Sequence, residues 1–286
     1  MANGDTPTRA GAAMSRLDEI VASKRREIEA LVRTPDAPLA PTGPADTLRS
    51  RRASLDVRAA LARSEGAPLR LIAEVKMKSP SAGPLSRALD AASRARVYAD
   101  AGATMVSILC DGPFFDGSFE DLARARAALD TAGLAVPLLA KEFILDAVQL
   151  DRARDSGADA ALLIARILPP PALSNLASAC RARGLEPLIE VTDEAELAAA
   201  LAAGARVVGV NARDLDTLVI DKARAARVLA AIPADVVAVH LSGLSTPASV
   251  ADVAAGRADA ALVGEALMRQ DAPGELLRAM VTAAKT

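Results

Sequence analysis

The 286-residue chain has few of the side chains from which metal centres and disulfide frameworks are built. It contains one histidine, His240, and two cysteines, Cys110 and Cys180, which stand far apart with no CxxC pair. A lone histidine cannot form a histidine-based zinc site, and two distant cysteines lack the paired spacing of a zinc ribbon. The sequence therefore predicts no bound metal and no disulfide framework.

The chain also has few aromatic residues and a nearly balanced charge. There is no tryptophan, one tyrosine and four phenylalanines, while hydrophobic residues make up 51% of the chain, so the core must come from Ala, Val, Leu and Ile. Such a core is ordinary for parallel sheets covered by helices. The formal net charge of -2 provides no basic surface, so we expect no nucleic-acid partner.

Long apolar runs are missing as well. No run approaches the roughly 18 to 20 apolar residues that cross a bilayer, and the polar N-terminus lacks the apolar stretch of a secretory signal. We therefore expect a cytoplasmic protein with no membrane partner. We also expect a monomer or a weak homo-oligomer.

The first quarter of the chain differs in composition from the rest. Residues 1–14 are small and polar and predict a flexible tail, whereas Leu17–Val32 has apolar residues at helical spacing and predicts an amphipathic helix. Prolines gather in Pro35–Pro44, which indicates a linker. Residues 15–69 are thus interpreted as a helical extension and linker, and residues 70–286 as the main domain.

From residue 70 onward, short apolar runs alternate with Ala-, Leu- and Arg-rich segments of helical period. The eight runs that predict strands are Arg70–Lys76, Thr104–Leu109, Val136–Ala140, Asp159–Ala165, Glu186–Val191, Arg206–Asn211, Val236–Leu241 and Asp259–Gly264. The expected helices are Leu89–Ala101, Phe119–Ala132, Asp146–Ser156, Ala172–Arg183, Glu194–Ala203, Asp221–Ala231 and Pro247–Ala255. Eight such units favour a closed α/β barrel, a single (β/α)8 TIM barrel with an extra N-terminal helix. An open Rossmann sheet is disfavoured because no GxGxxG follows an early strand.

Polar side chains follow most of the expected strands at their C-terminal ends, where barrels of this kind place their active sites. They are Glu74, Lys76, Ser79 and Ser81 after the first strand, Lys141 after the third, Glu190 after the fifth, Asn211 and Arg213 after the sixth, and Ser242 after the seventh. One such lysine or glutamate is usually a solvated loop residue or half of an ion pair. Two lysines, two glutamates, an asparagine and an arginine on one rim instead predict a catalytic site.

Glycines follow the last two strands, where many barrels bind phosphate. Ser242-Gly243 comes after the seventh strand and Gly264-Glu265 after the eighth. Backbone N–H groups at such turns can hold an anion, although a glycine there can also serve only a tight turn. The position of the two pairs in adjacent loops favours a phosphate site.

Several segments at these positions are distinctive, and through them the chain resembles the indole-3-glycerol-phosphate synthase family from Leu17 to Met280. They include IAEVKMKSPSAG (Ile72–Gly83), DGPFFDGSFEDL (Asp111–Leu122), PLLAKEFILDAVQL (Pro137–Leu150), LIEVTDEAEL (Leu188–Leu197) and VGVNARDLDTL (Val208–Leu218). The resemblance implies a ring-closing, decarboxylating carbon–carbon lyase of tryptophan biosynthesis that needs no cofactor. Its substrate would be an anionic sugar phosphate, 1-(2-carboxyphenylamino)-1-deoxyribulose 5-phosphate, which loses CO2 and water to give indole-3-glycerol phosphate.

The resemblance also implies roles for the polar residues. Lys141 would be the general acid of ring closure, and Glu190 would stabilise the cationic intermediate and assist proton removal. Lys76 would contact substrate anions and supply the acid for dehydration, while Glu74 and Asn211 would orient the lysines and the substrate hydroxyls. Ser242 is counted with these catalytic residues.

Further residues are expected to bind the substrate. Arg213 would pair with the anthranilate carboxylate, because a guanidinium can hold a carboxylate with two hydrogen bonds. Phe114 and Phe115 would cover the aromatic ring, or else only anchor their loop. The remaining expected contacts are Ser79 and Ser81 to the substrate, and Lys76, Gly243, Gly264 and Glu265 to the phosphate.

One departure from the family affects the expected site directly. After the seventh strand the family usually shows Ser-Glu-Ser-Gly, whereas this chain has Leu241 in place of the glutamate, preceded by His240. Loss of a negative charge beside two lysines should lower their pKa values and weaken the stabilisation of an iminium-like intermediate. The result would be a slower enzyme, a changed substrate or loss of activity, unless His240 replaces the lost polar group.

Three alternatives to a housekeeping synthase therefore stay open. A paralogue of specialised metabolism acting on a related aminodeoxyketose phosphate fits the Leu241 departure. A non-catalytic barrel subunit is disfavoured by the intact set of Glu74, Lys76, Lys141 and the other rim residues. Phosphoribosylanthranilate isomerisation uses the same fold, but the EVK-x-x-SPS run and Lys141–Phe143 fit the synthase better.

Overall fold

The computed structural model describes residues 15–33, 54–79, 83–214 and 219–285. The expected tail over residues 1–14, the linker Pro35–Pro44 and the candidate contact Ser81 lie outside the described residues. Within the described ranges, no helix is both long enough and apolar enough to cross a membrane.

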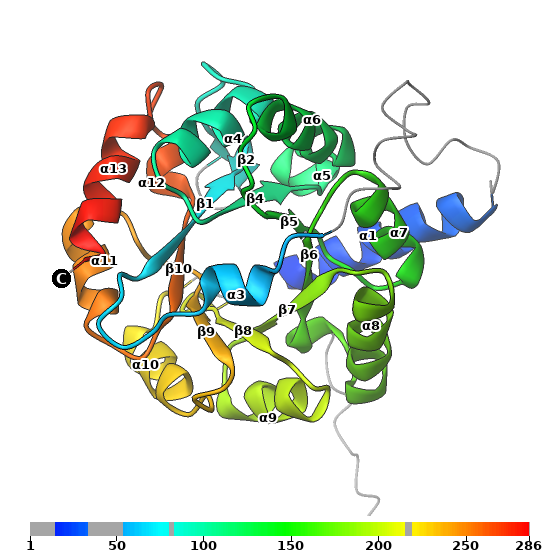
Figure 1. The fold of residues 1–286 in the computed structure, drawn as a ribbon. Helices are drawn as coiled ribbons and strands as arrows, with labels where there is room; N and C mark the ends of the chain where they lie inside the picture. Colours follow the sequence, from blue (N-terminus) through cyan, green and yellow to red (C-terminus); the bar gives the residue numbers. More distant parts are fainter. Residues whose placement is uncertain (1–14, 34–53, 80–82, 215–218, 286) are drawn as a thin grey trace, which may run out of the picture.

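Eight parallel strands close into a barrel, as the alternating pattern predicted (Figure 1). Each strand pairs with the next along the chain, and β1 closes the ring by pairing with β10. The strands are β1 (Arg70–Val75), β4 (Met105–Leu109), β5 (Leu138–Lys141), β6 (Ala160–Ile164), β7 (Glu186–Val191), β8 (Val207–Val210), β9 (Val237–His240) and β10 (Ala260–Val263). Their bounds lie within one or two residues of the expected ones. The predicted α/β fold, a (β/α)8 TIM barrel, is thereby confirmed.

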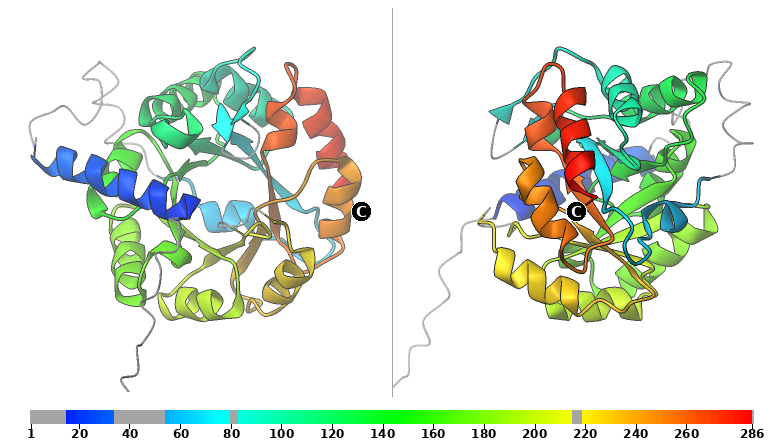
Figure 2. Two further views of the ribbon diagram at one scale, coloured as in Figure 1. Left: turned by 180° about the vertical axis from the view of Figure 1, so that it is seen from behind. Right: turned by 60° about the vertical axis from the view of Figure 1, so that its left-hand side comes forward.

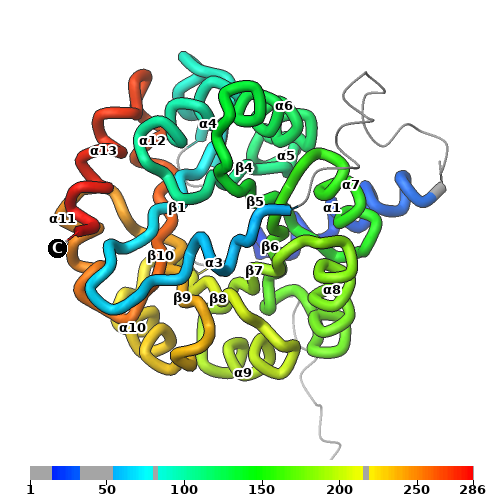
Figure 3. The backbone as a smooth tube through the Cα atoms, in the orientation of Figure 1, coloured from blue at the N-terminus to red at the C-terminus, as the bar shows by residue number. Residues whose placement is uncertain are grey.

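A layer of helices surrounds the strands (Figure 3). It consists of α4 (Ala91–Asp100), α6 (Phe119–Thr131), α7 (Ala147–Asp155), α8 (Pro170–Ala182), α9 (Glu194–Ala202), α10 (Lys222–Ala230), α11 (Pro247–Ala254) and α13 (Gly274–Ala283). Many begin directly after a side chain that caps the first turn; Asp90, for example, accepts a hydrogen bond from the Ser93 amide at 2.8 Å. Such caps satisfy backbone donors that have no partner within the helix, and so fix where each helix starts.

Short elements occupy the loops. They are the antiparallel pair β2 (Lys78–Ser79) and β3 (Gly83–Pro84), the helices α5 (Gly112–Phe115) and α12 (Glu265–Met268), and the 3-10 turn η1 (Ala165–Ile167).

The segment before the barrel contributes a helix to each end of it. Helix α1 (Arg16–Arg33) places Leu17 and Ile20 against the buried cluster inside the barrel, at the end where the strands finish (Figure 2, left). Helix α3 (Val57–Leu61) lies over the opposite end, with Leu61 fully buried in the same cluster (Figure 1). Helices α1 and α3 therefore pack against the barrel and bound its interior.

Alternation along each strand separates the barrel interior from the layer under the helices. In β9, Val237 and Val239 belong to the interior cluster, whereas Ala238 packs outward with the helices. Leu241 continues the inward series. Gly209 on the adjacent β8 makes room for it, because a Cβ there would lie 2.5 Å from Leu241 Cδ1.

Candidate active site

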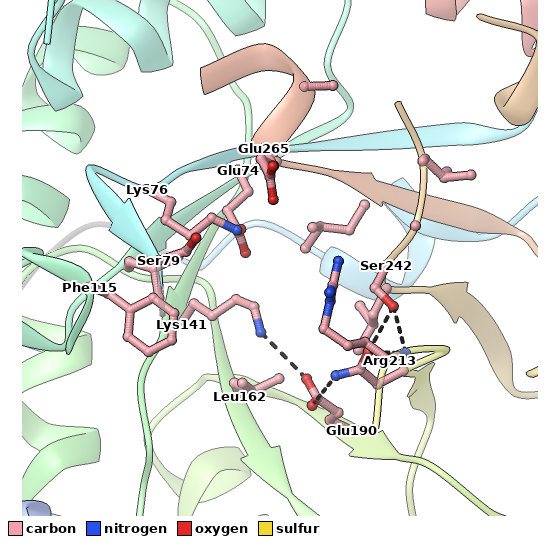
Figure 4. Close-up of a pocket in the computed structure, with 18 of the residues that line it drawn as sticks. Glu74, Lys76, Ser79, Phe115, Lys141, Leu162, Glu190, Arg213, Ser242 and Glu265 are labelled. Carbon is pink, nitrogen blue, oxygen red and sulfur yellow. Dashed lines mark hydrogen bonds and ion pairs between the residues drawn. The ribbon is translucent and has the colours of Figure 1, made fainter. Parts of the chain in front are cut away.

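A cavity of about 560 Å³ opens at the C-terminal ends of the strands. The expected site residues that line it are Glu74, Lys76, Ser79, Phe115, Lys141, Glu190, Asn211, Arg213, Ser242, Gly243, Gly264 and Glu265. Figure 4 shows the charged side chains among them reaching toward one another across its floor. The barrel topology has thus brought together residues that are spread over most of the chain.

Glu74 and Lys76 form a buried ion pair at the end of β1. Lys76 Nζ lies 2.8 Å from Glu74 Oε1, and Glu74 is only 3% exposed. Burial would raise the pKa of Glu74, but Lys76 and Lys141 together hold it below the ordinary glutamate value. Gly264 provides the space, since a Cβ at that position would lie 2.6 Å from Glu74 Oε1. The position of the Glu74 carboxylate therefore depends on residue 264 being a glycine.

Lys141, at the end of β5, lies between two carboxylates. Its Nζ is 3.4 Å from Glu190 Oε2, and Glu74 acts on it from the other side (Figure 4). Burial alone would lower the pKa of Lys141, but Glu190 and Glu74 outweigh it and raise the pKa above the ordinary lysine value. Lys141 is thus an ammonium at neutral pH and can serve as a proton donor.

Asn211 holds Glu190 through a network that extends to the next loop. Asn211 Nδ2 donates to Glu190 Oε1 at 2.9 Å, and Ser242 Oγ donates to Asn211 Oδ1 at 2.8 Å. The backbone N–H of Arg213 donates to Asn211 Oδ1 and to Ser242 Oγ, each at 3.0 Å. These bonds orient the amide so that its donor side faces Glu190, as the proposed orienting role of Asn211 requires.

Apolar side chains form a large part of the cavity wall. Its hydrophobic side chains are Leu109, Leu162, Ile164, Phe115, Phe143, Leu241 and Leu262. The rings of Phe115 and Phe143 lie 5.9 Å apart at a tilted angle. A wall of this kind fits an aromatic ring, while the lysines and arginines that line the same cavity fit anionic groups.

The two adjacent phenylalanines, Phe114 and Phe115, have different surroundings. Phe115 lines the cavity, whereas Phe114 is not among its lining residues and lies under the guanidinium of Arg16, 5.6 Å from Cζ to the ring centre. Phe114 thus contacts α1, and its ring-covering or loop-anchoring role stays a prediction. Arg16, Leu17 and Ile20 of α1 line the cavity, although no site residue was predicted in that helix.

Among the described residues, no group of three or more His, Cys, Asp and Glu side chains is arranged to hold a metal ion.

Comparison with known proteins leads to the same family as the distinctive sequence segments. A family model described as indole-3-glycerol phosphate synthase matches residues 17–280. The chain belongs to the indole-3-glycerol phosphate synthase family. It is 41% identical over 262 residues to the indole-3-glycerol phosphate synthase of Opitutus terrae, covering 92% of this chain and 97% of that protein. It is 40% identical over 276 residues to that of Micrococcus luteus, covering 96% and 99%.

Solved structures match the fold alone. Thiamine phosphate pyrophosphorylase from Pyrococcus furiosus superposes with a TM-score of 0.58 at 15% identity, covering 80% of this chain and 98% of that one. Sequence identity with members of the indole-3-glycerol phosphate synthase family, rather than this superposition, therefore carries the assignment.

Leu241, where the resemblance to the family led us to expect a glutamate, faces the cavity. It is 5% exposed and belongs to the interior cluster. Lys141 nevertheless keeps a raised pKa, because Glu190 and Glu74 are both retained. A lower lysine pKa than in a family member with glutamate here stays a prediction.

His240 does not take over the missing polar group. It precedes Leu241 by one residue in β9, so its side chain lies on the opposite, helix-facing side of the barrel wall, and it is not a lining residue. Burial is the main cause that lowers the pKa of His240, and Lys222 of α10 adds to the effect, while a backbone hydrogen bond with Ser242 opposes it. His240 is therefore a buried residue of the barrel wall that does not line the cavity.

Proposed function

We propose that the chain converts 1-(2-carboxyphenylamino)-1-deoxyribulose 5-phosphate to indole-3-glycerol phosphate, CO2 and water, as a decarboxylating carbon–carbon lyase. Membership of the indole-3-glycerol phosphate synthase family supports this function. The observation that carries it furthest is Lys141, an ammonium between Glu190 and Glu74 at the border of an apolar wall.

The proposed chemistry begins with attack of the anthranilate ring carbon on the substrate carbonyl. Lys141 gives its proton to the carbonyl oxygen, and the carboxylate of Glu190 stabilises the positive charge that develops on the ring nitrogen. The ring carboxylate leaves as CO2, and its bonding electrons restore the neutral amine. Dehydration follows, with Lys76 as the acid that protonates the departing hydroxyl and Glu190 as the base that accepts a proton.

Substrate binding would divide between the two kinds of wall. The aromatic ring would lie against the apolar residues that include Phe115 and Leu241, and Arg213 would bind its carboxylate. The phosphate would meet Lys76 and backbone N–H groups at Gly243, Gly264 and Glu265. The Glu265 carboxylate is bound to Arg269 at 2.7 Å, so its amide rather than its side chain is the proposed contact.

Leu241 supports a second candidate, a member of specialised metabolism with a related aminodeoxyketose phosphate as substrate. A leucine at this point of the cavity removes a charge and adds apolar surface beside the proposed ring site. Such a site would surround the substrate ring with less polar groups and would stabilise a cationic intermediate less.

The test follows indole fluorescence after mixing the protein with the synthase substrate. Product formation by the natural chain and none by Lys141→Ala would support the proposal. A natural chain that is silent but becomes active as Leu241→Glu would show that the missing carboxylate limits the reaction. Silence of all three proteins would favour the altered-substrate alternative and contradict the synthase activity.

A further inference from the structure

Lys24 is a buried lysine in the N-terminal helix, outside the residues that line the cavity. It lies on α1, one turn beyond Ile20, and is 3% exposed. Its Nζ is 3.1 Å from Asp111 Oδ1, 3.1 Å from Glu142 Oε1 and 2.7 Å from Glu27 Oε2. One ammonium thus joins α1 to two loops of the barrel that are far from it in sequence.

Both barrel carboxylates are themselves parts of the active-site loops. The Asp111 side chain caps α5 by accepting from the Phe114 amide at 2.9 Å, and this short helix carries Phe115 into the cavity. Glu142 directly follows Lys141 and accepts from the Phe143 amide at 2.7 Å. The cluster therefore holds the backbone on either side of the aromatic pair Phe115 and Phe143.

Lys24 compensates the burial of these carboxylates. Asp111 Oδ1 accepts no hydrogen bond from the described residues, so the ammonium 3.1 Å away offsets its charge. Burial, with Asp111 adding to it, raises the pKa of Glu142 to about 7, whereas Lys24 and the Phe143 amide oppose that rise. Without the lysine, Glu142 would be neutralised by a proton instead of an ammonium, and the ion pairs through which α1 holds both loops would be lost.

We propose that Lys24 is a positioning residue for the reaction: by fixing Glu142 and Asp111, it sets the place of Lys141 and of the aromatic wall. The inference rests on the proposed function, because it assigns the reacting acid to Lys141. It links the N-terminal helix to the catalytic groups through an ion cluster that lies outside the cavity lined by Arg16, Leu17 and Ile20 of the same helix.

The kinetic test compares Lys24→Met with Arg25→Met, which removes an exposed cation from the same helix. Displacement of a catalytic group by about 1 Å costs on the order of 100-fold in rate. We therefore expect Lys24→Met to lower kcat by about 10- to 100-fold, with a smaller rise in KM, at a temperature where circular dichroism shows it folded. Arg25→Met should stay within about twofold of the natural chain.

Two further variants separate positioning from loss of the fold. Lys24→Arg keeps the charge and should regain part of the lost kcat. Lys24→Met combined with Glu142→Gln has the same formal cluster charge as the natural chain, and it is the variant to measure if Lys24→Met alone does not fold. A folded Lys24→Met with kcat and KM within twofold of the natural values would overturn the proposal, since Lys24 would then only stabilise the protein.

A measurement without turnover distinguishes failure of this inference from failure of the proposed function. Hydrogen exchange should become at least tenfold faster at the Phe114 and Phe143 amides in Lys24→Met and remain unchanged in Arg25→Met. If the natural chain does not turn over the substrate but these amides respond, the function fails while the positioning link stands. If the two amides exchange as in the natural chain, the link is wrong.

Discussion

Gly264→Ala tests whether a missing side chain sets the position of the Glu74 carboxylate. An alanine Cβ at this position would lie 2.6 Å from Glu74 Oε1, whereas ordinary contacts begin near 3.4 Å. The oxygen must therefore move by roughly 0.8 Å. The backbone at Gly264 has a φ of -123°, so an alanine meets no left-handed strain there.

The expected fall in kcat follows from the contacts that Glu74 Oε1 makes. The same Oε1 binds Lys76 Nζ at 2.8 Å, and the buried carboxylate also contributes to the raised pKa of Lys141. A misplacement approaching 1 Å at a catalytic group costs on the order of 100-fold in rate. We therefore expect Gly264→Ala to lower kcat by about 30- to 100-fold, which corresponds to about 2 to 3 kcal/mol of activation free energy.

Steady-state kinetics on the synthase substrate measure this effect, and Gly256→Ala is the control. A Cβ at Gly256 would lie 3.4 Å from its nearest neighbour, Val253 O, so that variant should keep the natural kcat. Gly264→Ala retains the backbone N–H that is proposed to bind phosphate. A kcat within threefold of the natural value would therefore refute the steric argument, and a rise in KM with constant kcat would point to the phosphate site instead.

Four further outcomes follow from the structure. Asn211→Ala removes the donor that holds Glu190 at 2.9 Å, so kcat should fall by roughly 10-fold or more, and an unchanged kcat would contradict the orienting role. Leu61→Ala empties a fully buried position under the barrel and should lower the unfolding free energy by about 2 to 5 kcal/mol in urea titrations, with kcat unaltered. Because the pKa of Lys141 is raised on folding, its ammonium stabilises the folded state below pH 10.5, and this stabilisation is lost as the pH rises through the folded-state pKa. Urea titrations at several pH values would measure it, and Lys141→Met should lack this pH dependence of the unfolding free energy. For the same reason deprotonation of Lys141 should not reduce kcat below pH 10.5.

The barrel could be predicted from sequence because its strands and helices each leave a local pattern: short apolar runs for the strands and apolar residues at helical spacing for the helices. The runs that became β1 and β7 are short and apolar, and Asp or Ser precedes several of the helices, where a side-chain oxygen caps the first turn. Helix α13 was not predicted, although it buries Leu277 and Met280 three residues apart. Helices α5 and α12, of four residues each, are too short to show a period.

The polar floor of the site was predictable because parallel strands bring their C-terminal ends together. Glu74, Lys141 and Glu190 needed only the strand assignment to be placed on one rim. Other features depend on contacts between distant segments, which periodicity does not encode. The space that Gly264 leaves for Glu74, the burial of Lys24 and the lining by Arg16 are of this kind.

The most direct test of the account follows the carboxylate carbon of the substrate. With that carbon isotopically labelled, the natural chain should release one labelled CO2 for each indole-3-glycerol phosphate formed, and Lys141→Ala should release none above background. Consumption of the substrate without labelled CO2, or release by Lys141→Ala at the natural rate, would contradict the claim that the ammonium between Glu190 and Glu74 drives a decarboxylating ring closure.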